Sequence, residues 1–405
     1  MNSKFMKNFS WMLVANSFTF GLKWLIVIVI AKFLSPNYVG EYSLAFAVTA
    51  PIALFAQLKL RTMFVTEQKA TFSNFLLVRN FIDGVSFLLI LLITLVFYQE
   101  YLFVFLLVGT SKLLDLKSEL YYAIPHKNND LKFVGQLMII KNIVTFVSFL
   151  VVLIVFKNLD IALLVMVVVQ LLILLFFEKA KIIKKYHIVK ESLDKNIVIY
   201  IFKLSAPLGI VAMLFSFTVN IPRYVLEYYE STTVLGYFSA ILYILTVSNL
   251  FQTAISQVFL PKLSKLYNDN KRNEFIVFLW KKLMLTSCLL GVGMLLIVFI
   301  FDKQILGLIY GQDYIAYSNV FKLSMIATFI NLISGNLDTA LISIRAIKNQ
   351  PLILFVNLII TVSMSILLIS SYGIVGAAIT MIISSSILTI LRYVLYKKNM
   401  MKIKF

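Results

Sequence analysis

Long apolar runs separated by short polar connections dominate this chain. Twelve runs have roughly the 20 residues that a helix needs to cross the hydrocarbon core of a bilayer. Apolar residues are continuous along each run rather than alternating, which predicts membrane-spanning helices and not the strands of a barrel. The predicted spans cover residues 11–30, 42–58, 81–98, 101–121, 139–156, 160–177, 204–224, 237–260, 283–301, 317–341, 352–370 and 374–395.

Basic residues are concentrated on every second connection between these runs. Thirty-one of the 37 Lys and Arg lie at the two ends of the chain and on the five even-numbered connections. Cytoplasmic loops keep their Lys and Arg because translocating these charges is disfavoured. The pattern predicts a multi-pass protein of the cytoplasmic (inner) membrane with both termini in the cytoplasm.

Composition supports a membrane protein. Hydrophobic residues make up 61% of the chain and charged residues only 14%, whereas a soluble domain is about a quarter charged. A net charge of +19 often indicates nucleic-acid binding. Here the basic residues are dispersed among apolar runs, so we expect membrane lipids with anionic headgroups as partners, and no nucleic acid.

The longest basic connection, residues 178–203, divides the twelve spans into six and six. The two halves echo each other, with VGEYS at 39–43 opening the second span and LGYFS at 235–239 opening the eighth. Six is even, so both halves enter the bilayer from the same side and form parallel repeats, as in some secondary transporters. The expected fold is an all-α integral membrane protein whose two parallel six-helix lobes, 1–200 and 201–405, surround a central cavity.

Two basic residues within spans are candidates for substrate binding. Lys23 lies about twelve residues into the first span, roughly 18 Å deep at 1.5 Å per residue. A charge near mid-bilayer costs at least ~2.5–3.5 kcal/mol, so Lys23 should face a watery cavity or pair with a carboxylate in a structural contact. Arg223, near the outer end of the seventh span, either faces the same cavity or extends to outer headgroups.

Charged residues also share one face on the fourth span and on its counterpart, the tenth. Asp115 and Glu119 follow Lys112 at spacings of three and four, and Asp338 precedes Arg345 by seven. We consider Asp338, Asp115 and Glu119 candidates for ion coupling or gating. The alternative is that these segments project past the bilayer into the cytosol.

A cavity lined by Lys23, Arg223, Arg61 and Arg345 suits an anionic substrate. A guanidinium can bind two phosphate oxygens at once, and an ammonium acts as a point charge. Arg61 follows the second span directly, where it either closes the cytoplasmic mouth of the cavity or binds a lipid phosphate.

The sequence contains no motif for a cofactor, a metal or a catalytic centre. His126 and His187 both fall in connections, and no His, Cys or acidic cluster has metal-ligand spacing. No phosphate-binding glycine loop and no GxSxG motif occur. We therefore expect a transporter rather than an enzyme, without cofactor or metal, driven by an ion gradient or by mass action.

Several segments resemble a known family. FLSPNYVGEYS at 33–43 is similar to an aromatic-Leu-Gly-Pro-x-x-x-Gly-x-Tyr-Ser opening, with Ser35 in place of the glycine. SAPL at 205–208, RYVL at 223–226, LPKLS at 260–264 and YGIVGAA at 372–378 follow in the family's order. Over nearly its whole length the chain resembles Wzx-type polysaccharide flippases of the multidrug/oligosaccharidyl-lipid/polysaccharide exporter superfamily.

The resemblance implies that the chain flips an undecaprenyl-pyrophosphate-linked oligosaccharide across the cytoplasmic membrane by alternating access, for capsule, O-antigen or a similar surface polysaccharide. It implies glycosyltransferases and a polymerase of the same pathway as partners. Lys23 lies on the helix where related flippases place cavity cations. Arg223 matches the arginine of an Asp-Arg-Tyr pattern, but Pro222 stands where the acid is common.

Three alternatives remain open from the sequence. A drug or metabolite exporter could use the same fold. A membrane polysaccharide polymerase or an acyltransferase would be expected to have a large outer loop or an intramembrane histidine. A scaffold for polymer assembly would tolerate the loss of cavity residues.

Overall fold

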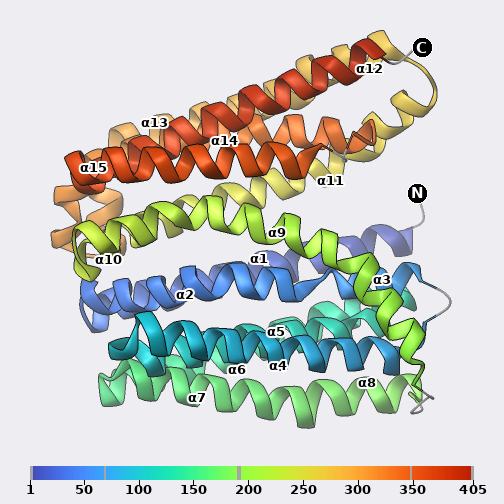
Figure 1. The fold of residues 1–405 in the computed structure, drawn as a ribbon, viewed down its shortest axis with the longest axis horizontal. Helices are drawn as coiled ribbons and strands as arrows, with labels where there is room; N and C mark the ends of the chain where they lie inside the picture. Colours follow the sequence, from blue (N-terminus) through green and yellow to red (C-terminus); the bar gives the residue numbers. More distant parts are fainter. Residues whose placement is uncertain (1–2, 68–69, 189–192, 347–348, 403–405) are drawn as a thin grey trace. The chain divides into compact units, whose positions relative to one another are not determined.

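The computed structural model describes residues 3–67, 70–188, 193–346 and 349–402, which form helices joined by short turns, without a strand in these ranges (Figure 1). This confirms the all-α class. The first half contains α1 (Ser3–Phe33), α2 (Pro36–Gln57), α3 (Leu60–Thr66), α4 (Phe72–Phe97), η1 (Gln99–Tyr101), α5 (Leu102–Lys127), α6 (Leu131–Phe156), α7 (Leu159–Leu172), η2 (Ile173–Glu178) and α8 (Lys179–Tyr186). The second contains α9 (Lys195–Tyr229), α10 (Thr232–Leu245), α11 (Val247–Asn268), α12 (Arg272–Phe278), η3 (Leu279–Met284), α13 (Leu285–Ile309), η4 (Gln312–Tyr317), α14 (Ser318–Ser343) and α15 (Gln350–Lys402).

Short polar residues set the starts of several helices. Asn158 accepts a hydrogen bond from the backbone N–H of Ile161 at 3.0 Å, where α7 begins. Ser231 accepts one from Val234 at 3.3 Å, where α10 begins. These caps satisfy N–H groups that the first turn of a helix leaves unpaired.

Asp130 joins the start of α6 to the end of α8. Its carboxylate accepts hydrogen bonds from Lys185 Nζ at 2.6 Å and from the Tyr186 hydroxyl at 2.8 Å. Burial raises the pKa of Asp130, but these two hydrogen bonds and the charge of Lys185 outweigh burial, so the pKa is lowered from its usual value. The contact therefore keeps its strength at neutral pH.

Breaks in helical geometry within α15 and between α2 and α3 shape the path of the chain. In α15, Gly373 has φ +52° and ψ −133°, a backbone conformation that favours glycine. Between α2 and α3, Leu58 and Lys59 both have φ +47°. Because neither is a glycine, this left-handed pair carries strain that the surrounding packing must hold.

Ten of the described segments are long and apolar enough to cross a membrane. The last of them, Gln350–Met400, contains the break at Gly373 and so covers two predicted spans. The predicted fourth span corresponds to α5. This helix is not among the ten segments, because its four charged residues between positions 112 and 119 make it less apolar. Counting α5 and both parts of α15 gives twelve long helical segments in the described ranges, in agreement with the sequence.

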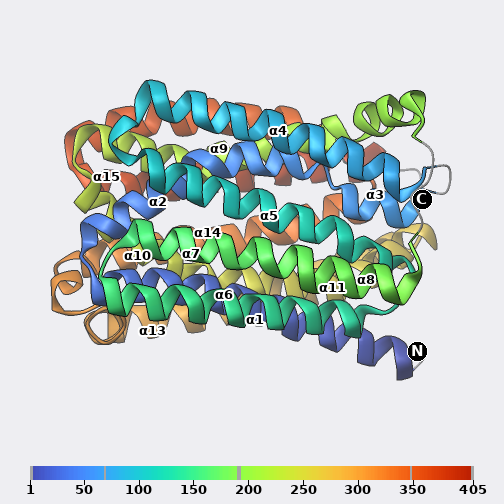
Figure 2. The same cartoon turned by 90° about the horizontal axis from the view of Figure 1, so that it is seen from below.

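Contacts divide the chain into two compact units, Met1–Ser216 and Phe217–Phe405. In unit 1, α5 is central, since it packs against α2, α4 and α7 while α6 joins α1 to α7 (Figure 2). In unit 2, α14 has the same position, packed against α11, α13 and α15. The central helices are thus the fourth and the tenth segments, the pair that the internal repeat matches.

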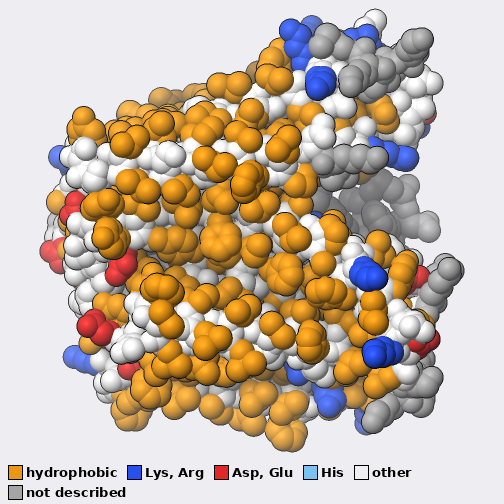
Figure 3. All heavy atoms as spheres, viewed as in Figure 1, with side chains coloured by type: hydrophobic (Ala, Val, Ile, Leu, Met, Phe, Trp, Pro, Cys, Tyr) orange, Lys and Arg blue, Asp and Glu red, His pale blue; other side chains and the backbone are white. Residues whose placement is uncertain are grey.

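The flanks of the molecule are apolar. Large hydrophobic side chains such as Phe81, Leu92 and Phe97 are mostly exposed, and hydrophobic atoms cover most of the face drawn in Figure 3. An apolar belt of this extent fits acyl chains, not water.

Candidate functional site

The polar face of α5 forms the centre of the site. Asp115 and Glu119 lie one helical turn apart on α5. Because α5 is the central helix of unit 1, this face is turned toward neighbouring helices. The carboxylate of Asp115 is enclosed by contacts from α1 and α6.

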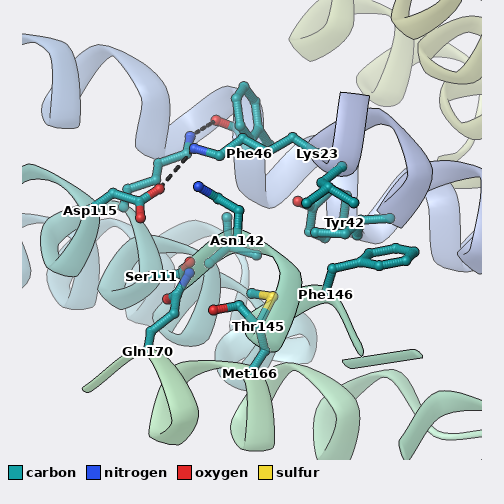
Figure 4. A pocket seen from close by; sticks show the side chains of 14 residues that line it. Lys23, Tyr42, Phe46, Ser111, Asp115, Asn142, Thr145, Phe146, Met166 and Gln170 are labelled. Atoms are coloured by element: carbon teal, nitrogen blue, oxygen red, sulfur yellow. Dashed lines mark hydrogen bonds and ion pairs between the residues drawn. The ribbon is translucent and has the colours of Figure 1, made fainter. Parts of the chain in front are cut away.

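Asp115 binds two lysines from two different helices. Its Oδ2 is 2.8 Å from Lys23 Nζ of α1 (Figure 4). Its Oδ1 is 2.8 Å from Lys141 Nζ of α6. The Lys141 side chain is 5% exposed and the Lys23 side chain 53%. Asp115 therefore holds both ammonium groups at once, and Lys23 is the more accessible of the two.

Sequence reasoning missed Lys141. Lys141 is one of the 31 basic residues counted on the connections, although it lies just inside the predicted span 139–156, and α6 begins ten residues before it, at Leu131. A signal was present, since Lys141, Thr145 and Ser148 follow one another at helical spacings of four and three within an apolar run.

A chain of hydrogen bonds leads from this ion pair toward the end of α7. Lys141 Nζ donates to Ser118 Oγ at 2.8 Å, and Ser118 Oγ donates to Glu178 at 2.6 Å. The Tyr122 hydroxyl donates to the other oxygen of Glu178, which is fully buried. Glu178, the last residue of η2, was the second residue that the sequence did not single out.

Arg61 and Glu119 lie near this chain of bonds. Gln57 Nε2 donates to Glu119 at 3.1 Å, and the guanidinium of Arg61 lies 6.0 Å from the centre of the Tyr122 ring. The Nε of Arg61 is buried without a hydrogen-bond partner in the part of the chain that the structure describes. The structure thus brings Lys23, Asp115, Glu119 and Arg61 to one polar region of unit 1.

A small pocket opens beside the Lys23–Asp115 pair. Its volume is about 50 Å³, and its walls come from α1, α2, α5, α6 and α7. The polar lining comprises Lys23, Tyr42, Ser111, Lys112, Asp115, Asn142, Thr145 and Gln170. In Figure 4, Ser111, Thr145 and Gln170 lie together on one wall, below the Lys23–Asp115 pair.

Arg223 belongs to unit 2, near the end of α9. Its side chain is buried, and Nη1 donates to Asn220 Oδ1 at 2.5 Å. Its Nε has no hydrogen-bond partner among the described residues. The guanidinium thus lies within the helix packing of this structure, and its part in substrate binding stays a prediction.

Asp338 and Arg345 are not brought together. Asp338 Oδ1 accepts from Gln350 Nε2 at 2.9 Å and lies 3.4 Å from Arg392 Nη2 of α15. Arg345 follows the end of α14, with φ +58° and an exposed side chain. Sequence reasoning missed Arg392 as the partner of Asp338, because Arg392 is one of the basic residues near the C-terminal end that the charge pattern explains as cytoplasmic.

Comparison with known proteins decides the family. The model of a family described as polysaccharide biosynthesis protein matches residues 5–267. The capsular polysaccharide biosynthesis protein CapF of Staphylococcus aureus is 32% identical over 395 residues, covering 97% of this chain and 99% of that protein. The chain belongs to the polysaccharide biosynthesis protein family.

Solved structures of other membrane proteins share the fold of this chain. The Lipid II flippase MurJ, in an inward closed conformation, matches with TM-score 0.75 at 16% identity over 96% of this chain and 89% of that chain. An inward-facing multidrug resistance MATE family transporter matches with TM-score 0.80 at 10% identity over 94% of both chains. At such identities the likeness shows the fold alone.

These findings confirm the part of the resemblance that concerns polysaccharide biosynthesis, and they confirm a fold of the kind found in flippase and transporter structures. The chain is a multi-pass membrane protein of a polysaccharide biosynthesis family, with a fold used by flippases and transporters. In the described residues, no group of three or more His, Cys, Asp or Glu is placed to hold a metal ion.

Proposed function

We propose that this protein flips a lipid-linked oligosaccharide, with undecaprenyl pyrophosphate as the carrier, from the cytoplasmic to the outer leaflet for a surface polysaccharide. One relative supports the substrate class, since CapF is named for capsular polysaccharide biosynthesis. The fold that the chain shares with the Lipid II flippase MurJ is compatible with a flipping mechanism. The two repeats of six segments support alternating access. The head of the substrate is charged and the tail apolar, which matches a polar interior with apolar flanks.

The two lysines on Asp115 carry this proposal. Lys141 already neutralises the carboxylate from the buried side. Lys23, half exposed, pairs with the other oxygen of Asp115 and is the accessible member of the network. A pyrophosphate or an acidic sugar would compete with Asp115 for its ammonium group, so Lys23 is the primary substrate cation.

The other candidate residues take secondary roles in the proposed cycle. Arg223, with its unused Nε, is the substrate cation of the second repeat. Arg61 binds phosphate at the cytoplasmic end, and Arg345, which is exposed, binds headgroups or substrate there. The carboxylates of Asp115, Glu119 and Asp338 each bind a side chain already. We infer that these residues act in gating, by exchanging those side-chain partners between the states of the cycle. Glycosyltransferases and a polymerase would act before and after the flipping step.

Replacing Lys23 by Ala tests the proposal. In cells that depend on this protein for polymer export, Lys23→Ala should lower export at least about tenfold at equal protein level, while lipid-linked oligosaccharide accumulates inside. Lys397→Ala, on an exposed lysine at the end of α15, is the matched control and should export normally. Normal export by Lys23→Ala would refute the cationic site.

The same cells separate the remaining alternatives. A drug exporter would change resistance to toxic cations without changing polymer export. A polymerase would leave single repeat units on the outer leaflet, where an added glycosidase could reach them, whereas loss of a flippase keeps them inside.

A further inference from the structure

The pocket in unit 1 contains two buried polar groups that the protein leaves unused. The side chains of Thr145 and Gln170 are 5% and 6% exposed. Thr145 Oγ1 and Gln170 Oε1 have no hydrogen-bond partner within the described ranges. A buried polar atom without a partner costs about 1–3 kcal/mol, so a ligand or water must supply the partner.

The conformation of Thr145 is unusual for this protein. Buried threonines elsewhere in its helices donate to the carbonyl four residues earlier, as Thr49, Thr94 and Thr328 do at 2.7–2.8 Å. Thr145 makes no such bond within the described residues, and its hydroxyl lies on the pocket wall beside Gln170 (Figure 4). The hydroxyl is therefore available to a molecule in the pocket.

Charge and size restrict what the pocket can hold. Lys23 and Lys112 line it with only one carboxylate, Asp115, which is shared with Lys141. The surplus of positive charge excludes a cation. A volume of about 50 Å³ holds three or four waters, or one group of about that many heavy atoms, and so excludes a whole sugar ring.

We propose that this pocket binds a single oxyanion group of the substrate, a carboxylate or a phosphoryl, between Lys23, Thr145 and Gln170. Lys23 has three N–H donors and gives one of them to Asp115. Thr145 donates its hydroxyl, and the Gln170 amide can turn its NH2 toward the anion. Lys141 keeps Asp115 neutralised while Lys23 shifts to the ligand. This inference rests on the proposed function, because it places part of that substrate inside one repeat.

Probe binding to the purified full chain in lipid nanodiscs tests the pocket. Methyl phosphate and glucuronate are titrated by calorimetry into the wild type, Thr145→Val/Gln170→Leu, and Thr49→Val as matched control. We expect at least one probe to bind the wild type and the control equally, and the double variant at least about tenfold more weakly. Binding of methyl phosphate alone would identify the carrier phosphate as the source, and binding of glucuronate alone would identify an acidic sugar.

Two results would refute the proposed binding of an oxyanion in this pocket. One is equal binding by the double variant and the wild type, and the other is a wild type that binds neither probe. If the double variant fails to fold, Gln170→Glu keeps the size of the side chain and should abolish binding by repulsion; unchanged binding there also refutes the site. Loss of export in Lys23→Ala together with either result would leave the proposed function standing and remove only the pocket.

Discussion

At the scale of single residues, Asp115 divides its two oxygens between lysines that differ in burial. A buried ion pair that loses one partner costs about 3–5 kcal/mol, since the other charge remains uncompensated. An exposed pair contributes about 0–1 kcal/mol. Lys141 is nearly inaccessible and Lys23 is half exposed, so one lysine holds the fold while the other is free to act on a ligand.

Methionine in place of each lysine should separate these roles. Lys141→Met should destabilise the protein by about 3 kcal/mol or more, and Lys23→Met by less than about 1 kcal/mol. Thermal unfolding of the purified protein measures both. Adding Asp115→Asn to Lys141→Met should recover part of the loss, because it removes the uncompensated charge. Equal losses from the two lysine variants would contradict this division of roles.

Residues that interrupt an apolar run are the ones that the sequence could identify. Lys23 stands alone deep within the first span, and Asp115 belongs to a charged group within the fourth, so both could be found by position. Lys141 and Glu178 adjoin basic connections, where a charged residue is expected. Their burial depends on how far α6 and η2 continue and on what packs there, which composition does not encode.

At the scale of elements, α9 lies close against the end of α2. A Cβ added to Gly209 would lie 2.7 Å from the backbone oxygen of Phe55. Phe55 precedes the left-handed pair Leu58 and Lys59, so this contact is made where α2 stops. The apolar pattern predicts the end of the span at residue 58, but without Gly or Pro nearby it gives no sign of the left-handed pair.

Alanine substitutions at two helical glycines test this contact. Gly209→Ala should lower the thermal unfolding midpoint, since backbone cannot move aside as a flexible side chain can. Gly84→Ala in α4 is the matched control, because nothing lies within 4 Å of its added Cβ. There alanine should stabilise the helix by up to about 1 kcal/mol. Similar effects of both substitutions on the unfolding midpoint would show that the close contact of α9 with the end of α2 does not contribute to stability.

At the scale of the whole molecule, the distribution of basic residues predicts which loops face the cytoplasm. Lys157, between α6 and α7, should lie outside, and Asp269, between α11 and α12, inside. In a Cys288→Ser background, a membrane-impermeant maleimide should label Lys157→Cys in intact cells and Asp269→Cys only after permeabilisation. Labelling in the opposite order would invert the proposed topology and place both termini outside.

Most of this architecture could be predicted from the pattern of apolar residues. Spans, helical class and the match between the fourth and tenth segments could be predicted, because the bilayer requires long apolar helices and the repeat preserves their order. The central packing positions of α5 and α14 could not, because they depend on contacts among segments far apart in sequence.

The charges of α5 have a consequence for biogenesis. A segment with Lys112, Asp115, Lys117 and Glu119 enters lipid poorly on its own, at about 2.5–3.5 kcal/mol for each central charge. Its compensating lysines come from α1, synthesised earlier, and from α6, synthesised later. We therefore expect α5 to settle in the bilayer only once Lys141 has left the ribosome. Glycosylation mapping of two truncated chains tests this order. A glycosylation site placed in α5 should be accessible in a chain that ends before α6 and protected in a chain that includes α6.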